Sequence, residues 1–263
     1  MPTKKHIIQI SDLHVFGDPK KKLLGVNTRE SFKAVVDLLK AESQIDAIIL
    51  SGDLSQDGSY NSYRFIAEEL DTLGCPVYYI AGNHDSADMD KGLAYGHLVN
   101  AKQISLNNWS MVLLNSQKQN AVEGYLDEIQ FNVLSQTLNE SNNEYIAVSF
   151  HHQPVLIGSS WIDQIGLKNA NQFWALVDRY PQVKLVLFGH VHQVFEGRHK
   201  QVHCLSAPST CIQFQPLQSN FALQKIPPGF RWIDLYPNGQ YETGIKRLAN
   251  YVGDFNPDAA GYD

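Results

Sequence analysis

Three short apolar segments near the start of the chain alternate with two segments of helical periodicity. The apolar segments, residues 7–10, 47–50 and 77–80, are rich in β-branched and aromatic residues, which is typical of buried strands. Between them, apolar side chains recur at helical spacing in residues 32–39 and 60–73, and Asn27 or Thr28 can cap the first of these helices. This order predicts βαβ units and therefore an α/β fold.

Each of these apolar segments ends in polar residues that are suited to a metal. Asp12 and His14 follow the first, Asp53 follows the second, and Gly82-Asn83-His84-Asp85 follows the third. Because side chains alternate along an extended segment, Asp12 and His14 can face the same ion. Ligands of open α/β sheets bind at this edge, although each motif taken alone is also consistent with a polar turn.

Two later apolar segments end in the same way. Residues 145–150 lead into His151-His152, where either histidine could be a ligand, and residues 184–188 lead into Gly189-His190-Val191-His192. Histidines at i and i+2 after a glycine can serve two ions that lie close together. Further strands are expected at 104–106, 109–114, 201–205, 231–235 and 241–246, and further helices at 126–138, with Ile129 facing inward, and at 173–177.

Polar ligand candidates thus follow five predicted strands, which is too regular for surface turns alone. The candidates are Asp12, His14, Asp53, Asn83, His151, His190 and His192. Carboxylates, an amide oxygen and imidazoles, without thiolates, suit Fe, Mn or Zn. Seven ligands exceed the need of one tetrahedral ion, so we expect two divalent metal ions with Asp53 between them. His84 cannot easily reach the ion that Asn83 binds, so its imidazole is a candidate acid or electrophile.

The composition argues against several classes of protein. The 263 residues are 43% apolar and 18% charged, which is ordinary for a globular chain, and a net charge of −6 with only short basic clusters predicts no nucleic-acid partner. No apolar run approaches membrane-spanning length, and three cysteines without C-x-x-C spacing suit a reducing compartment, so we expect a cytoplasmic protein with no membrane partner. We expect a single domain over residues 1–250 and an acidic, fraying tail over 251–263; nothing indicates the oligomeric state.

The ordered motifs resemble those of the calcineurin-like metallophosphoesterase superfamily. They are Asp12-Leu13-His14, Gly52-Asp53, Gly82-Asn83-His84-Asp85, His151 and Gly189-His190-Val191-His192. Residues 23–28, 160–163 and 208–214 further resemble the bacterial 3′,5′-cyclic-AMP phosphodiesterases, the class III cyclic nucleotide phosphodiesterases. The resemblance spans nearly the whole chain and implies a four-layer α/β/β/α sandwich with a dinuclear centre at the strand ends.

Residue roles follow from this resemblance. It implies that Asp12, His14 and His192 hold one metal, that Asn83, His151 and His190 hold the other, and that Asp53 bridges them. It also implies that a metal-bridging hydroxide hydrolyses cyclic AMP to 5′-AMP, while His84 protonates or stabilises the departing 3′-oxygen. His14, Asp53, Asn83, His84 and His192 would contact the substrate, with Asp53 and His84 catalytic. Two divalent cations make the centre locally positive, so it attracts a phosphodiester despite the net charge.

Two other functions fit the same metals. One is a broader phosphodiesterase that acts on 2′,3′-cyclic nucleotides or other small phosphodiesters, and the other is a protein-binding scaffold, which we disfavour because no ligand position is lost. The pocket that would select a base is sought in the neutral loop 206–228, where Phe214 and Phe221 could pack on a purine or equally fill the core. Ser209, Thr210 and Gln213 could then bind ring nitrogens.

Overall fold

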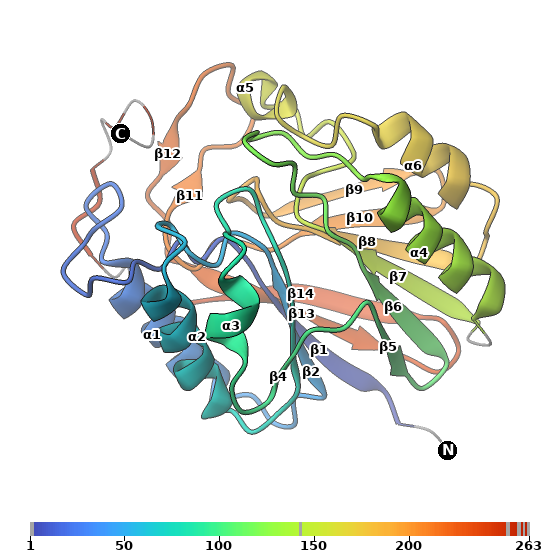
Figure 1. Cartoon of the computed structure of the whole chain (residues 1–263), viewed down its shortest axis with the longest axis horizontal. Coiled ribbons are helices and arrows are strands. Elements are labelled where there is room, and N and C mark those ends of the chain that lie inside the picture. Colours follow the sequence, from blue (N-terminus) through green and yellow to red (C-terminus); the bar gives the residue numbers. More distant parts are fainter. Residues whose placement is uncertain (1–2, 142–143, 251–252, 257–258, 260, 262–263) are drawn as a thin grey trace.

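Two six-stranded sheets lie face to face at the centre of the molecule, with helices outside each of them (Figure 1). The computed structural model describes residues 3–141, 144–250, 253–256, 259 and 261. The strand orders are β14-β13-β1-β2-β3-β4 and β5-β6-β7-β8-β10-β9. Helices α1 to α3 cover the first sheet, and α4 and α6 cover the second. This arrangement confirms the α/β/β/α sandwich.

The first half of the chain forms the predicted βαβ units. Its elements are β1 (Lys5–Ile10), α1 (Thr28–Leu39), β2 (Ala47–Ser51), α2 (Tyr60–Asp71), β3 (Val77–Ile80), α3 (Met89–Leu93) and β4 (Leu98–Val99). Strands β1, β2 and β3 are parallel neighbours, so all three end at the same edge of the sheet. Asn27 caps α1, because its side chain accepts from the N–H groups of Arg29 and Glu30.

The second sheet is also built mainly on parallel strands. Its elements are β5 (Gln103–Leu106), β6 (Trp109–Leu113), α4 (Glu128–Glu140), β7 (Tyr145–Ser149), α5 (Ser160–Asp163), α6 (Ala170–Val177), β8 (Val183–Phe188), β9 (Phe195–His199) and β10 (Val202–Ser206). After the short hairpin β11 (Gln213–Phe214) and β12 (Leu223–Gln224), β13 (Gly229–Leu235) and β14 (Tyr241–Arg247) join the first sheet in antiparallel fashion.

Successive residues of the first sheet serve two separate cores. Ile7 and Ile49 pack with the second sheet, whereas Ile8 and Ile48 pack with helices α1 and α2. Because neighbouring side chains of a strand point to opposite faces, a strand between two layers is apolar at nearly every position, and a buried polar side chain such as Gln9 must be hydrogen-bonded. This explains why the strands read as continuous apolar runs in the sequence.

One sequence prediction is wrong. Ile129 of α4 is 62% exposed, because the inward stripe runs through Leu134 and Leu138, and five residues of helix turn Ile129 about 140° away from Leu134. The predicted acidic tail over residues 251–263 lies largely outside the described residues; within it, the backbone N–H of Asn256 donates to the carbonyl of Leu24. Within the part of the chain that the structure describes, no helix is long and apolar enough to cross a membrane.

Candidate metal centre

The polar residues predicted as ligands come together where the strands of both sheets end. Hydrogen bonds join the loops that carry them: the backbone N–H of Asp12 donates to Gly52 O at 3.1 Å, and the N–H of His190 donates to Asp12 Oδ1 at 2.9 Å. Ligand atoms within 4.8 Å of one another form several overlapping groups. These are Asp12/His14/His192, Asp12/Asp53/His151, His14/Asp53/His84 and His151/His152/His190. Asn83 lines the same cavity as Asp53.

The backbone at these strand ends is strained. Asp12, His14, Asp53, His190 and His192 all have φ between 44° and 69°, the left-handed region that side chains other than glycine rarely adopt. Such strain persists only where the surrounding structure enforces it, and it gathers at functional sites. Close packing adds to the constraint, because a Cβ atom at Gly82 would lie 2.2 Å from Asp53 Oδ1.

Hydrogen bonds on the outer side of the centre orient three histidines. Nδ1 of His14 lies 2.6 Å from Gln56 Oε1, and Nδ1 of His151 and of His192 lie 2.8 and 3.0 Å from the carbonyls of Ser51 and Ile212. Because these oxygens only accept, each Nδ1 must carry the hydrogen. In the neutral imidazole each Nε2 then presents its lone pair to the centre, which is the arrangement that metal-binding histidines use.

The ring nitrogens and carboxylates converge closely. His14 Nε2 lies 2.9 Å from His192 Nε2, and Asp53 Oδ2 lies 3.7 Å from His14 Nε2 and 3.2 Å from His151 Nε2. Asp53 therefore sits between two groups of nitrogens, as expected of a bridging carboxylate. Two lone pairs at 2.9 Å repel each other unless a cation lies beside both.

Four buried polar atoms of the centre make no hydrogen bond of acceptable geometry among the described residues, although one of them, His151 Nε2, lies 3.2 Å from Asp53 Oδ2. They are Asp12 Oδ2, Asn83 Oδ1, His151 Nε2 and His190 Nε2. A buried acceptor that lacks a partner costs about 1–3 kcal/mol, so four in one place require an explanation. All four are lone-pair donors, and a cation satisfies such atoms. The residues therefore fit metal ions.

The pKa shifts of the histidines also favour a metal site. Burial lowers the pKa of His14 to about 3 and holds the pKa of His190 and His192 well below the usual range, which leaves these imidazoles neutral. Burial also opposes the charge of His151, but Asp53 outweighs burial and raises the pKa of His151 to about 9. The carboxylate thus favours a positive charge at the position that a divalent ion would occupy.

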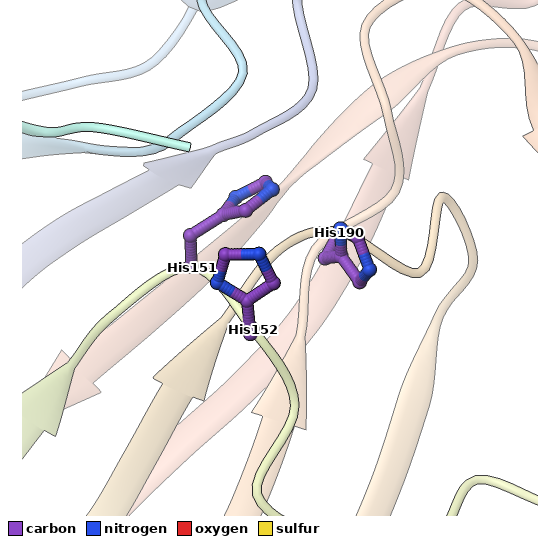
Figure 2. Close-up of side chains that lie close together, drawn as sticks. All are labelled: His151, His152 and His190. Atoms are coloured by element: carbon purple, nitrogen blue, oxygen red, sulfur yellow. The ribbon is translucent and has the colours of Figure 1, made fainter. Parts of the chain in front are cut away.

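The structure distinguishes His151 from its neighbour His152. Both rings lie beside His190 (Figure 2), but Nδ1 of His152 lies 2.8 Å from the Ser116 hydroxyl, and its Nε2 lies 3.2 Å from the Val122 carbonyl. Both nitrogens of His152 are therefore engaged outside the centre. His151 has one nitrogen on a carbonyl and the other facing Asp53.

A cavity of about 130 Å³ adjoins the centre. One side is polar, and the other is an apolar wall of Val122, Trp161, Ile162, Ile165 and Phe214; the polar side consists of Asp53, Asn83, His84, His190 and His192. A wider groove of about 980 Å³, between residues 83–87 and 117–123, shares Asn83 and Val122 with this cavity.

Some residues of the site could not be found from the sequence, and two residues expected to bind the base are engaged in other hydrogen bonds. Gln56 lies close to Asp53 in the chain, so the sequence could have indicated it as a hydrogen-bond partner of a ligand. Nothing in the sequence indicates that Val122 and Ile165 line the cavity. Ser209 and Gln213 are not available to a ligand, because Ser209 Oγ donates to Asp12 O at 2.7 Å and Gln213 Nε2 donates to Ser209 O at 2.8 Å. Ser209 and Gln213 stabilise the loop 206–228 instead of binding a ligand.

Comparison with known proteins establishes the class. Residues 5–194 match the profile described as calcineurin-like phosphoesterase, so the chain belongs to this family, whose members use a dinuclear metal centre. Among solved structures, a dimetal phosphatase from Danio rerio shares the fold, with a TM-score of 0.64 at 13% identity over 89% of this chain and 96% of that chain. A purple acid phosphatase from yellow lupin gives 0.66 at 12% identity, over 97% and 54% of the two chains.

Closer relatives are cyclic-nucleotide phosphodiesterases. The chain is 38% identical to the 3′,5′-cyclic adenosine monophosphate phosphodiesterase CpdA of Pseudomonas aeruginosa, over 97% of this chain and 94% of the relative. It is 40% identical to a 3′,5′-cyclic-nucleotide phosphodiesterase of Nostoc sp., over 92% of each chain. The CpdA of Escherichia coli is 36% identical over 97% of this chain and 93% of the relative.

Proposed function

We propose that this protein hydrolyses 3′,5′-cyclic AMP to 5′-AMP at a dinuclear metal centre. The four buried lone-pair donors around Asp53 that have no hydrogen-bond partner among the described residues carry the proposal, because cations at the place where the strands end would satisfy all of them. The relatives support the choice of substrate, since several that match along nearly their whole length are named cyclic-AMP phosphodiesterases.

The ligand assignment keeps the two groups that the family resemblance implies. Asp12, His14 and His192 hold one ion, Asn83, His151 and His190 hold the other, and Asp53 lies between them. His151 is assigned in preference to His152 because only His151 has a buried nitrogen without a partner among the described residues. Oxygen and imidazole donors favour Fe, Mn or Zn.

When bound, two divalent cations lower the pKa of a coordinated water and offset the charge of the phosphate. The chain supplies orientation and a proton. The backbone N–H of His84 donates to Asp53 Oδ1 at 2.9 Å, and the His84 ring lies edge-on to His14 at 4.9 Å, on the polar side of the cavity. As water oxygen bonds to phosphorus, the bond from phosphorus to O3′ breaks, and His84 gives its proton to O3′.

A location in the cytoplasm belongs to the same proposal. All three cysteines, Cys75, Cys204 and Cys211, are free and buried, and burial raises their pKa to between about 11 and 12. Such thiols contribute no disulfide to the fold, which suits a reducing compartment.

One observation favours a second candidate function, that of a broader phosphodiesterase. The wider groove beside Asn83 and Val122 has room for a larger leaving group. To test the proposal, the metal-stripped protein is reconstituted with Mn²⁺ or Fe²⁺ and given cyclic AMP, cyclic GMP, 2′,3′-cyclic AMP and bis(p-nitrophenyl) phosphate. We expect metal-dependent hydrolysis with kcat/KM highest for cyclic AMP. A preference for 2′,3′-cyclic AMP or the linear diester would establish the broader activity instead.

A further inference from the structure

We infer that the apolar wall of the cavity is the base subsite of this enzyme and that Trp161 determines its specificity. The inference rests on the proposed function, since it concerns the heterocycle of a cyclic nucleotide whose phosphate lies at the metals. The wall consists of Val122, Trp161, Ile162, Ile165 and Phe214.

The wall lies next to the metal ligands. Phe214 stacks on the ring of His192, with centroids 4.3 Å apart and planes 14° apart, and Trp161 packs edge-on against Phe214 at 5.0 Å. Trp161 is therefore two ring contacts away from a candidate ligand. In a cyclic nucleotide one ribose carries both the phosphate and the base, so a phosphate beside His192 places the base within reach of this wall.

The size and polarity of the cavity suit one heterocycle. A cavity of about 150 Å³ lined by apolar side chains holds benzene, so about 130 Å³ beside an open mouth matches a single ring system. Among the described lining residues, the polar ones are ligand candidates and His84, so the base meets mainly apolar surface. Guanine has more polar groups to leave without partners than adenine, and this favours adenine.

Trp161 is held firmly in place. It belongs to α5, where Asp163 accepts the backbone N–H groups of Ile157 and Gly158 at 2.8 and 3.1 Å. Gln153 Nε2 donates to the Ile162 carbonyl at 2.8 Å, and Phe221 packs on the indole at 5.3 Å. A wall that is rigid before the ligand arrives loses little entropy on binding.

The indole also has an unused donor. Trp161 Nε1 is buried and has no hydrogen-bond partner within the described part of the chain. Because this N–H lies in the plane of the ring, a base stacked on the indole face does not accept it, but a polar group of the ligand at the edge of the indole, such as a ribose hydroxyl, would satisfy it. Stacking and this hydrogen bond together make Trp161 the largest contributor to the wall.

The test compares two substrates that differ only in the base. One is cyclic AMP, and the other is the 3′,5′-cyclic phosphate of 1-deoxyribose, which has no base. In Trp161→Ala we expect the KM for cyclic AMP to rise about 5- to 100-fold, the usual effect of losing one stacking platform. The kcat/KM for the abasic substrate should change less than about threefold. Trp161→Phe, which keeps a stacking ring, should restore most of the loss.

Trp232 provides a matched control. It is also a half-buried tryptophan, but it lines a cavity at the other end of the first sheet, so Trp232→Ala should leave both KM values unchanged. Melting temperatures show whether each variant folds. Equal losses on both substrates in Trp161→Ala, or an unchanged KM for cyclic AMP, would overturn the inference while the wild-type activity stands. If the wild type hydrolyses only the abasic substrate, the proposed substrate is wrong instead.

Discussion

Strand β1 has a charged cluster at each end, and the two clusters differ in how their polar atoms are paired. At its beginning, ion pairs join Lys4 to Asp234, Lys5 to Asp46 and Lys246 to Glu42, and His6 also contacts Asp234. At its end, the carboxylates of Asp12 and Asp53 meet buried imidazoles, and several buried atoms have no hydrogen-bond partner among the described residues. At the beginning of the strand, His6 Nε2 alone of these groups has no hydrogen-bond partner among the described residues, and it lies 3.9 Å from Glu42 Oε2. Several unsatisfied atoms in one place, and not the charges alone, therefore indicate a metal centre.

The largest effect is expected at Asp53. Asp53→Ala should lower kcat by at least about 10⁴-fold and remove bound metal, because Asp53 lies between both groups of ligands. The measurement is kcat together with metal content by elemental analysis. The corresponding change at the other end of β1, Asp234→Ala, should leave kcat and the metal content within a fewfold of the wild-type values. One tightly bound ion per chain in a fully active wild type would contradict the two-metal centre.

His84 is expected to act on the reaction and not on the metals. His84→Ala should lower kcat by about 10²–10⁴-fold, the usual scale for a general acid, while the metal content stays near that of the wild type. A substrate with a better leaving group, such as bis(p-nitrophenyl) phosphate, should lose much less, because its departing oxygen needs no proton. If the variant loses metal, His84 belongs among the ligands.

Asp85 is expected to act through positioning. Its buried carboxylate accepts from the N–H groups of Leu54, Ser55 and Gly82 and from the Tyr63 hydroxyl, which ties the loop after β2 to the loop after β3. Asp85→Asn turns an amide donor toward these donors and should weaken metal binding about 10- to 100-fold. Metal titration measures the loss. Near-normal kcat at saturating metal distinguishes positioning from catalysis, and an unchanged metal affinity would refute the role.

The smallest effect is expected at the opposite cluster. Burial raises the pKa of Asp234, but hydrogen bonds from Lys4 and His6 outweigh burial and hold it below the usual range. A lowered pKa stabilises the fold above the unfolded pKa of about 3.9, and this stability is lost as the pH falls through the folded pKa. The melting temperature of Asp234→Asn should thus be a few degrees below that of the wild type at pH 6, and the gap should close toward pH 2. A gap that does not depend on pH would show that charge is not its cause.

The apolar runs and the residues after them could be predicted from the sequence because local patterns encode them. A strand buried on both faces is apolar at nearly every position, and a ligand at a strand end lies within a few residues of it, so Asp12, His14, Asp53, Asn83, His190 and His192 were found without a structure. Ile129 shows the limit of such a prediction. When apolar residues are spread around a helix, their spacing does not determine which face of the helix points inward.

Only the tertiary structure determines which of two neighbouring residues belongs to the site and which residues line the pocket. His151 and His152 are adjacent and chemically identical, and they differ because the carbonyls of Ser51 and Val122, far away along the chain, face them. Likewise Trp161 and Phe214 form one wall although 53 residues separate them, and Gln213, one residue away, is used to hold its own loop. The sequence determines which side chains the strands deliver to the edge, because that information is local. Packing between distant segments determines which of their atoms remain without partners, and those atoms mark the site.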